Sequence, residues 1–197
     1  MSELCLSFFG GRLRISPFAI ASLSLMFYIE GQASFFVIIS AALLHELGHV
    51  VAVYLLGSRV LQIELHAVGA VIFFDHAAVS YKKEALIAFS GPLANIIFGL
   101  IAAVFFLRFN SVMLLLFVLS CAFFAVFNLL PLKGNDGWNI VRALCADKKG
   151  IEFAEKATKI IAAVASALGA LSALYLYRIS GASPAVAALL LFSAIPS

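Results

Sequence analysis

The sequence predicts an all-α polytopic membrane protein of about six transmembrane helices, with a short membrane-associated β-hairpin between the second and third. Three observations predict this class. Of the 197 residues, 64% are hydrophobic and only 12% are charged, which is too few polar residues to cover a soluble domain. Apolar runs long enough to cross a bilayer recur along the chain. The basic residues gather in the segments on one side of these runs.

The expected spans are apolar stretches separated by short polar segments. A bilayer-crossing helix needs about 20 mostly apolar residues, and the first and last stretches are shorter than that. No repeat or low-complexity linker divides the chain, so residues 1–197 are expected to form a single domain. In order, the expected spans cover residues 17–29, 33–56, 85–107, 112–130, 160–177 and 184–195.

Basic residues set the expected orientation. Six spans place both termini on one side, and lysine and arginine favour the cytoplasmic side. Of the 13 basic residues, only Arg108 and Arg178 fall on the opposite side. Both termini are therefore expected in the cytoplasm. The basic residues on the side of the termini are Arg12, Arg14, Arg59, Lys82, Lys83, Lys133, Arg142, Lys148, Lys149, Lys156 and Lys159.

Charge and cysteine content exclude some other classes. The net charge of +3, without a basic patch among aromatic residues, argues against nucleic-acid binding. Cys5, Cys121 and Cys145 are isolated, which predicts no disulfide framework. Arg12 and Arg14 precede the first apolar run without a signal-peptide cleavage site, so that run is expected to be retained as a span.

The segment between the second and third spans reads "VLQIELHAVGAVIFFDH", residues 60–76. Polar and apolar residues alternate over residues 61–66, which is the period of a strand. Gly69 is suited to a turn or bulge, and the following "AVIFF" is β-prone. We expect a short hairpin against the cytoplasmic face of the membrane. An irregular amphipathic connector is the alternative interpretation of the same residues.

Three ionisable side chains interrupt the second span, in "AALLHELGHVVAVYLLG". His45 and His49 are four residues apart and so lie on one face of a helix, with Glu46 beside them. H-E-x-x-H is the pattern of two zinc ligands with a glutamate as base. Each charged group at the centre of a span costs roughly 2.5–3.5 kcal/mol on insertion scales. The pattern therefore predicts a metal site within the membrane.

Zinc needs a third protein ligand, and several residues remain open for that role. His66, His76, Asp75 and Asp147 are candidates, and the most suggestive is Asp136 in "FNLLPLKGNDGWNIV". Proline and two glycines permit a break in the helix that returns this carboxylate to the bundle. An Asn-Asp-Gly turn that merely ends a helix explains the same residues equally well.

These motifs together resemble the site-2 protease family of intramembrane metalloproteases. That family pairs HExxH with N-x-x-P-x-x-x-x-D-G two spans later, and here Asn128, Pro131, Asp136 and Gly137 have that spacing. The resemblance implies that His45, His49 and Asp136 hold Zn²⁺ and that Glu46 is the catalytic base. "SGPLANII" resembles the family's motif in the intervening span, through Gly91, Pro92 and Asn95.

The match is closest to the stage IV sporulation protein FB branch, a bacterial cell-membrane protein. The sequence departs from that branch by showing no CBS domain, and it shows no PDZ domain. The resemblance implies hydrolysis of peptide bonds within or next to membrane segments of a protein substrate, such as a membrane-associated pro-sigma factor or an anti-sigma factor. Asn95, Asn128 and His66 are candidate substrate-binding residues. A regulatory membrane partner or a homo-oligomer is compatible with the sequence.

Two other functions remain to be weighed against the protease. A metal-ion transporter could use His45, Glu46 and His49 as a transit site. A transit route needs ligands on both sides of the membrane, whereas the non-cytoplasmic side offers Glu30 alone among carboxylates and no histidine. A metal-binding membrane scaffold without turnover is the other alternative, and only an assay distinguishes it.

Overall fold

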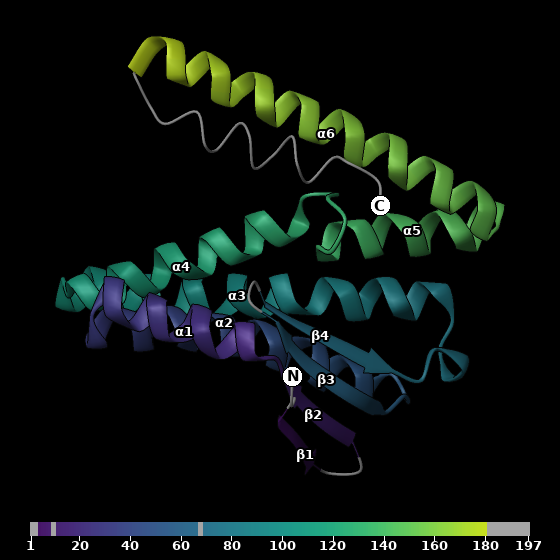
Figure 1. The fold of residues 1–197 in the computed structure, drawn as a ribbon, viewed down its shortest axis with the longest axis horizontal. Coiled ribbons are helices and arrows are strands. Elements are labelled where there is room, and N and C mark those ends of the chain that lie inside the picture. Colours follow the sequence, from purple (N-terminus) through teal and green to yellow (C-terminus); the bar gives the residue numbers. More distant parts are fainter. Residues whose placement is uncertain (1–3, 9–10, 67–68, 181–197) are drawn as a thin grey trace. The chain divides into compact units, whose positions relative to one another are not determined.

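The computed structural model of the chain describes residues 4–8, 11–66 and 69–180. Figure 1 shows them as a mostly helical structure with a small sheet. The chain divides into two compact units, Met1–Val126 and Phe127–Ser197. The first unit contains the sheet and most of the apolar helices, and the second contains the chain from the end of the fourth helix onward.

The sheet has four strands in the order β1 (Leu4–Phe8), β2 (Gly11–Ile15), β3 (Val60–His66) and β4 (Gly69–Phe74). The expected hairpin is confirmed as the antiparallel pair β3–β4. The sheet is nevertheless larger than expected, because β1 and β2 form a second hairpin and β2 runs parallel to β3.

The parallel pair β2–β3 joins segments about fifty residues apart in the sequence. Leu13 lies opposite Ile63, and Arg14 lies opposite Glu64. The Arg14 guanidinium is 3.6 Å from the Glu64 carboxylate. Polar and apolar residues alternate in "GRLRI", which is the period of a strand with one polar and one apolar face.

The apolar face of the β3–β4 hairpin packs on two helices. Val53, Val60 and Ile87 form a buried cluster, and partly buried side chains of β3 and β4 such as Ile63 and Ile72 pack against it. Burial of apolar side chains stabilises each by roughly 1.5–3 kcal/mol. The cluster fixes the hairpin beside the end of α2, which carries His45 and His49, and the first turns of α3.

Within the described residues, three helices are long and apolar enough to cross a membrane: α2 (Gln32–Leu55), α3 (Tyr81–Phe109) and α4 (Val112–Leu129). They match the second, third and fourth expected spans. The first expected span is a shorter apolar helix, α1 (Pro17–Glu30). A short 3-10 turn, His76–Ala78, precedes α3.

The remaining two expected spans have different outcomes. Residues 160–177 lie within α6 (Ile151–Ser180), whose first turns are charged. Residues 184–195 lie outside the described residues. The number of six crossing helices therefore stays a prediction.

α2 and α3 pack closely because a glycine lies between them. A Cβ on Gly48 would lie 2.6 Å from the carbonyl oxygen of Ser90 and 2.9 Å from the Cβ of Ala94. Real Cβ atoms essentially never approach so near, so only glycine permits this packing. The close approach occurs at the level of His45 and His49, and it brings α3 within hydrogen-bonding range of their rings.

The second unit begins at the last turn of α4 and contains α5 (Asp136–Lys149) and α6. The predicted break is present, because α4 ends at Leu129 and α5 begins at Asp136. Gly134 adopts φ 95°, a left-handed conformation that favours glycine. A new helix, α5, begins directly after the break.

Candidate metal centre

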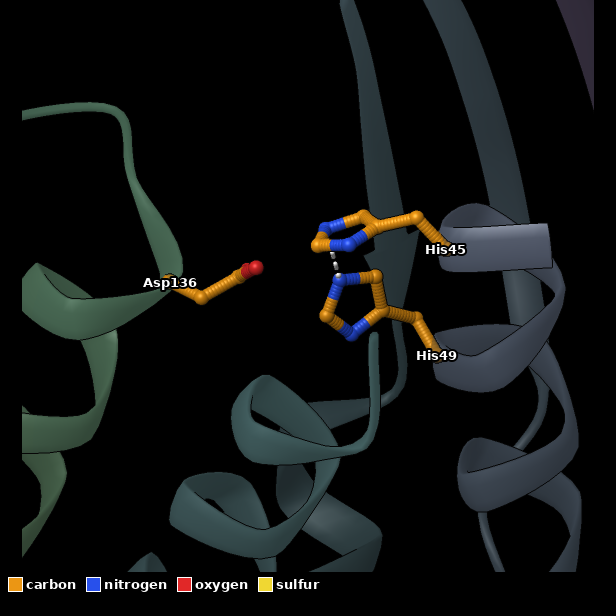
Figure 2. A group of neighbouring side chains, drawn as sticks. All are labelled: His45, His49 and Asp136. Atoms are coloured by element: carbon orange, nitrogen blue, oxygen red, sulfur yellow. Dashed lines mark hydrogen bonds between the residues drawn. The ribbon is translucent and has the colours of Figure 1, made fainter. Parts of the chain in front are cut away.

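His45 and His49 lie one turn apart on α2, and both are buried. Their rings are nearly perpendicular, with centroids 4.8 Å apart. Figure 2 shows the two side chains projecting from α2 toward a common point, where the two Nε2 atoms lie 3.2 Å apart. The expected shared face of the helix is therefore confirmed.

The His49 ring is oriented by the backbone of α3. Its Nδ1 lies 2.8 Å from the carbonyl oxygen of Ile87, which can only accept. Nδ1 therefore carries the proton and donates it, and Nε2 keeps a lone pair. A neutral imidazole with a bonded Nδ1–H and a lone pair on Nε2 is the form that ligates zinc.

The His45 ring also has its partner on α3. The Asn95 side-chain amide lies 3.1 Å from His45 Nδ1, and Asn95 is fully buried. The sequence gave Asn95 as a candidate substrate-binding residue, and in the structure its amide contacts a side chain of α2. The other amide atom, Oδ1, is buried without a hydrogen bond among the described residues.

The space between the histidines fits a metal ion. Two nitrogens bound tetrahedrally to one Zn²⁺ at about 2.0–2.1 Å are roughly 3.3 Å apart, close to the observed 3.2 Å. Gly91 leaves this space open: a Cβ there would lie 2.9 Å from His45 Nε2 and closer still to His49 Nε2. The donors and their spacing therefore fit zinc.

Glu46 follows His45 on α2 and is half-buried. Its position places a carboxylate beside the histidine face of the helix. A carboxylate so placed, next to two nitrogen donors, is suited to proton transfer from a water molecule near them.

Asp136 belongs to the second unit, where it is the first residue of α5 (Figure 2). Asn135 precedes it and donates from its side-chain amide to the carbonyl of Phe127, at 2.7 Å. A Cβ on Gly137 would lie 2.7 Å from the carbonyl oxygen of Leu130 and closer still to that of Leu129. These interactions fold α5 tightly against the end of α4 and present Asp136 at a helix start, where a carboxylate is favoured.

The competing ligand candidates have other partners. His66 ends β3 and lies 3.3 Å from Glu64, and His76 lies 3.0 Å from Glu84. The Asp75 carboxylate is 3.7 Å from Arg59. Asp147 is exposed near the far end of α5. Among the described residues, neither His66 nor His76 clusters with the two histidines of α2.

Sequence reasoning missed the part that the Ile87 carbonyl plays at the site. A backbone carbonyl leaves no mark in a sequence, because every residue has one. Gly48 stands inside the H-E-x-x-H motif itself, yet its packing against α3 became visible only in the structure. Glycine at a mid-helix position, where it is unfavourable by about 1 kcal/mol, was the available sign of a close approach.

The chain is similar to known proteins in sequence and in fold. A family model described as Peptidase M50B-like matches residues 18–180, which include every residue of the candidate site. A zinc metalloprotease of Methanocaldococcus jannaschii is 30% identical over 147 residues, an alignment that covers 72% of this chain and 42% of that protein. The chain thus spans less than half the length of this curated relative.

A solved structure has the same fold. The site-2 protease from Methanocaldococcus jannaschii matches with a TM-score of 0.65 and 22% identity, over 98% of this chain and 94% of that one. The fold and the family match define the class. The chain belongs to the Peptidase M50B-like family, so the family expected from the sequence is confirmed.

Proposed function

We propose that this protein is an intramembrane zinc metalloprotease, which hydrolyses peptide bonds within or next to membrane segments of a protein substrate. The observation that carries the proposal is the pair of Nε2 atoms 3.2 Å apart on an apolar helix long enough to cross a membrane. Glu46 stands beside that pair, and the chain belongs to a peptidase family.

The proposed zinc ligands are His45 Nε2, His49 Nε2 and a carboxylate oxygen of Asp136. His49 supports this assignment because its proton is held on Nδ1 by Ile87. Asp136 is supported by the spacing of its motif and by the turn that begins α5 with this residue. Three protein ligands leave one position for water or substrate, as in catalytic zinc sites.

The proposed chemistry divides between the metal and Glu46. Bound Zn²⁺ would lower the pKa of water toward neutrality and polarise a carbonyl group. Glu46 takes the proton of the attacking water and delivers it to the leaving amine. A positioned base of this kind contributes roughly 10²–10⁴-fold to the rate.

A substrate helix must unwind before its backbone can react, because its carbonyls are bonded within the helix. β4 is an edge strand of the sheet, and an edge strand can pair with an extended peptide. We propose that β3 and β4 hold the unwound substrate, with His66 at the end of β3 near its path. Asn128, in the last turn of α4, is the other proposed substrate-binding residue.

Water is proposed to reach the site from the cytoplasm. From His49 to the end of α2 at Leu55 is about 9 Å at 1.5 Å per residue. With both termini cytoplasmic, residues 60–83 and 133–149 face the same side. Single cysteines at Gln32 and Lys82, in a background without Cys5, Cys121 and Cys145, should then react with an impermeant reagent from opposite sides. Labelling of both from outside would overturn the orientation.

The proposed substrates are membrane proteins or membrane-associated proteins, with pro-sigma factors and anti-sigma factors as the first classes to test. Such a role would place the chain in regulated intramembrane proteolysis, in sporulation or in general signalling. We propose that residues 1–197 act as one domain in the lipid bilayer, with a regulatory membrane partner or a second copy as additional components to assay.

Co-expression with a panel of single-span and membrane-associated precursors tests the proposal. We expect cleavage of at least one precursor, inhibition of that cleavage by a zinc chelator, and no cleavage by a variant with Glu46→Gln. A Glu30→Gln variant, altered at the end of α1, is the matched control and should cleave normally. Zinc flux into vesicles without cleavage of any precursor would favour the transporter.

A further inference from the structure

Asn95 is a buried polar side chain of α3 that has no role in the chemistry proposed above. It is 0% exposed, and its amide lies 3.1 Å from Nδ1 of His45, on another helix. An uncompensated amide in an apolar interior costs free energy, so a side chain of this kind inside an apolar helix needs a function. Its hydrogen bond with His45 shows where that function lies.

The position of the proton on His45 depends on which amide atom faces the ring. The structure places Nδ2 there, which donates, so Nδ1 accepts and the proton belongs to Nε2. His45 Nε2 then donates to the lone pair of His49 Nε2, so hydrogen bonds run from Asn95 through both histidines to Ile87. Histidine in this tautomer cannot ligate a metal through Nε2.

Rotation of the same amide by 180° exchanges its two atoms. Oδ1, which has no hydrogen bond in the present orientation, then faces the ring and accepts from Nδ1–H. The proton leaves Nε2, and both histidines present a lone pair to the space that Gly91 keeps open. No proton is gained or lost by the protein, because the change is between two tautomers of a neutral ring.

We propose that Asn95 is the positioning residue of His45, and that its amide turns to present oxygen to Nδ1 when zinc binds. This inference rests on the proposed zinc site. Asparagine suits the position better than aspartate because it can donate to the ring of the empty site and accept from the ring of the loaded one. Ile87, whose carbonyl only accepts, holds His49 in one tautomer throughout.

Zinc affinity of the full chain in detergent, measured by competition with a chromophoric chelator, tests the role. Asn95→Leu keeps the volume but loses the hydrogen bond, and should weaken zinc binding by about 10–100-fold, as is typical when a ligand loses its orienting partner. Asn95→Asp keeps an acceptor and should bind zinc more tightly than the leucine variant. A purely structural role predicts the reverse order, because leucine packs better than a buried carboxylate.

Ser120→Ala is the matched control. The Ser120 hydroxyl is also buried, and it donates to the Leu116 carbonyl of its own helix at 2.8 Å. Its loss should leave zinc affinity unchanged. Unchanged affinity in Asn95→Leu, or an aspartate variant as weak as the leucine one, would overturn the proposal.

A measurement on the unaltered chain keeps the proposal testable if the variants fold poorly. The protein has four histidines, so ¹⁵N-histidine spectra can be assigned with His66→Gln and His76→Gln. His45 should carry its proton on Nε2 without metal and on Nδ1 with zinc, whereas His49 should carry it on Nδ1 in both. A His45 proton on Nδ1 in the metal-free chain would contradict the amide rotation. Wild-type protein that binds no zinc would instead contradict the proposed function.

Discussion

The α2–α3 pair and the α4–α5 turn each carry part of the proposed zinc site, and they hold their side chains by different means. His45 and His49 lie on a regular helix, and their partners, Asn95 and Ile87, are 50 and 38 residues away in the sequence. Asp136 begins a helix directly after a break, and the amide that ties this turn reaches back only eight residues, from Asn135 to Phe127.

Because the histidines and Asp136 are held by different contacts, they should respond to different substitutions. The histidine pair depends on the packing of two helices, so a change on α3 reaches it without touching α2. The aspartate depends on its own turn, so only local changes should move it. Substitutions can separate these two kinds of dependence, beginning with the largest effect.

Asp136→Ala should remove both zinc and cleavage. Loss of a direct ligand weakens binding by more than the roughly 10–100-fold that follows the loss of an orienting group. Zinc stoichiometry of folded, detergent-purified protein is the measurement. Asp147→Ala, a change of the same type in the same helix, should keep zinc and activity. Stoichiometric zinc in the Asp136 variant, together with an empty site in His66→Ala, would make the site a three-histidine one.

Gly91→Ala should greatly weaken zinc binding while leaving the helices intact. Alanine favours helix over glycine by about 1 kcal/mol, so α3 itself is not weakened. The added Cβ would instead meet both Nε2 atoms and force the rings out of their ligating orientation. Zinc titration and circular dichroism of one preparation check the two halves of this prediction.

Gly99→Ala is the matched control for that change. Gly99 lies on the same helix, and a Cβ there would meet only the Cβ of Cys121, at 3.1 Å. A shift of a few tenths of an ångström accommodates it. Equal zinc affinity in the Gly91 and Gly99 variants would show that the space beside Gly91 is not the metal position.

His66→Ala should have the smallest effect. Its side chain is exposed at the end of β3 and lies near Glu64, so zinc affinity should equal that of the wild type. Cleavage should slow only if the end of β3 touches the substrate. His76→Ala, which loses its interaction with Glu84, is the companion variant and should keep both zinc and cleavage. Loss of zinc in either variant would make that histidine a direct metal ligand.

The sequence predicted best those features that have a short period. The apolar runs of α2, α3 and α4 and the four-residue spacing of His45 and His49 both follow from helical geometry. The break before Asp136 was visible in Pro131 and two glycines. A local pattern is sufficient for each of these features because the residues that determine it are neighbours.

Features that depend on distant pairing were found only in part. The strand β2 was overlooked because its partner β3 lies about fifty residues away, although the alternation of Arg12, Leu13, Arg14 and Ile15 has the period of a strand. The sequence placed Asn95 among the candidates for substrate binding, since no local pattern shows that it faces His45. The packing of α2 on α3 determines this hydrogen bond, and sequence spacing alone does not reveal packing.

The proposal that Glu46 is the base of a zinc protease is tested most directly by Glu46→Gln, assayed for metal and for cleavage in the same preparation. Glutamine keeps the shape of the side chain but cannot take a proton, and Glu46 is proposed as a base and not as a ligand. We predict stoichiometric zinc, as in the wild type, with no detectable cleavage of a precursor that the wild type cleaves. Full cleavage by this variant would contradict the proposed mechanism, and loss of zinc would show that Glu46 is itself a ligand.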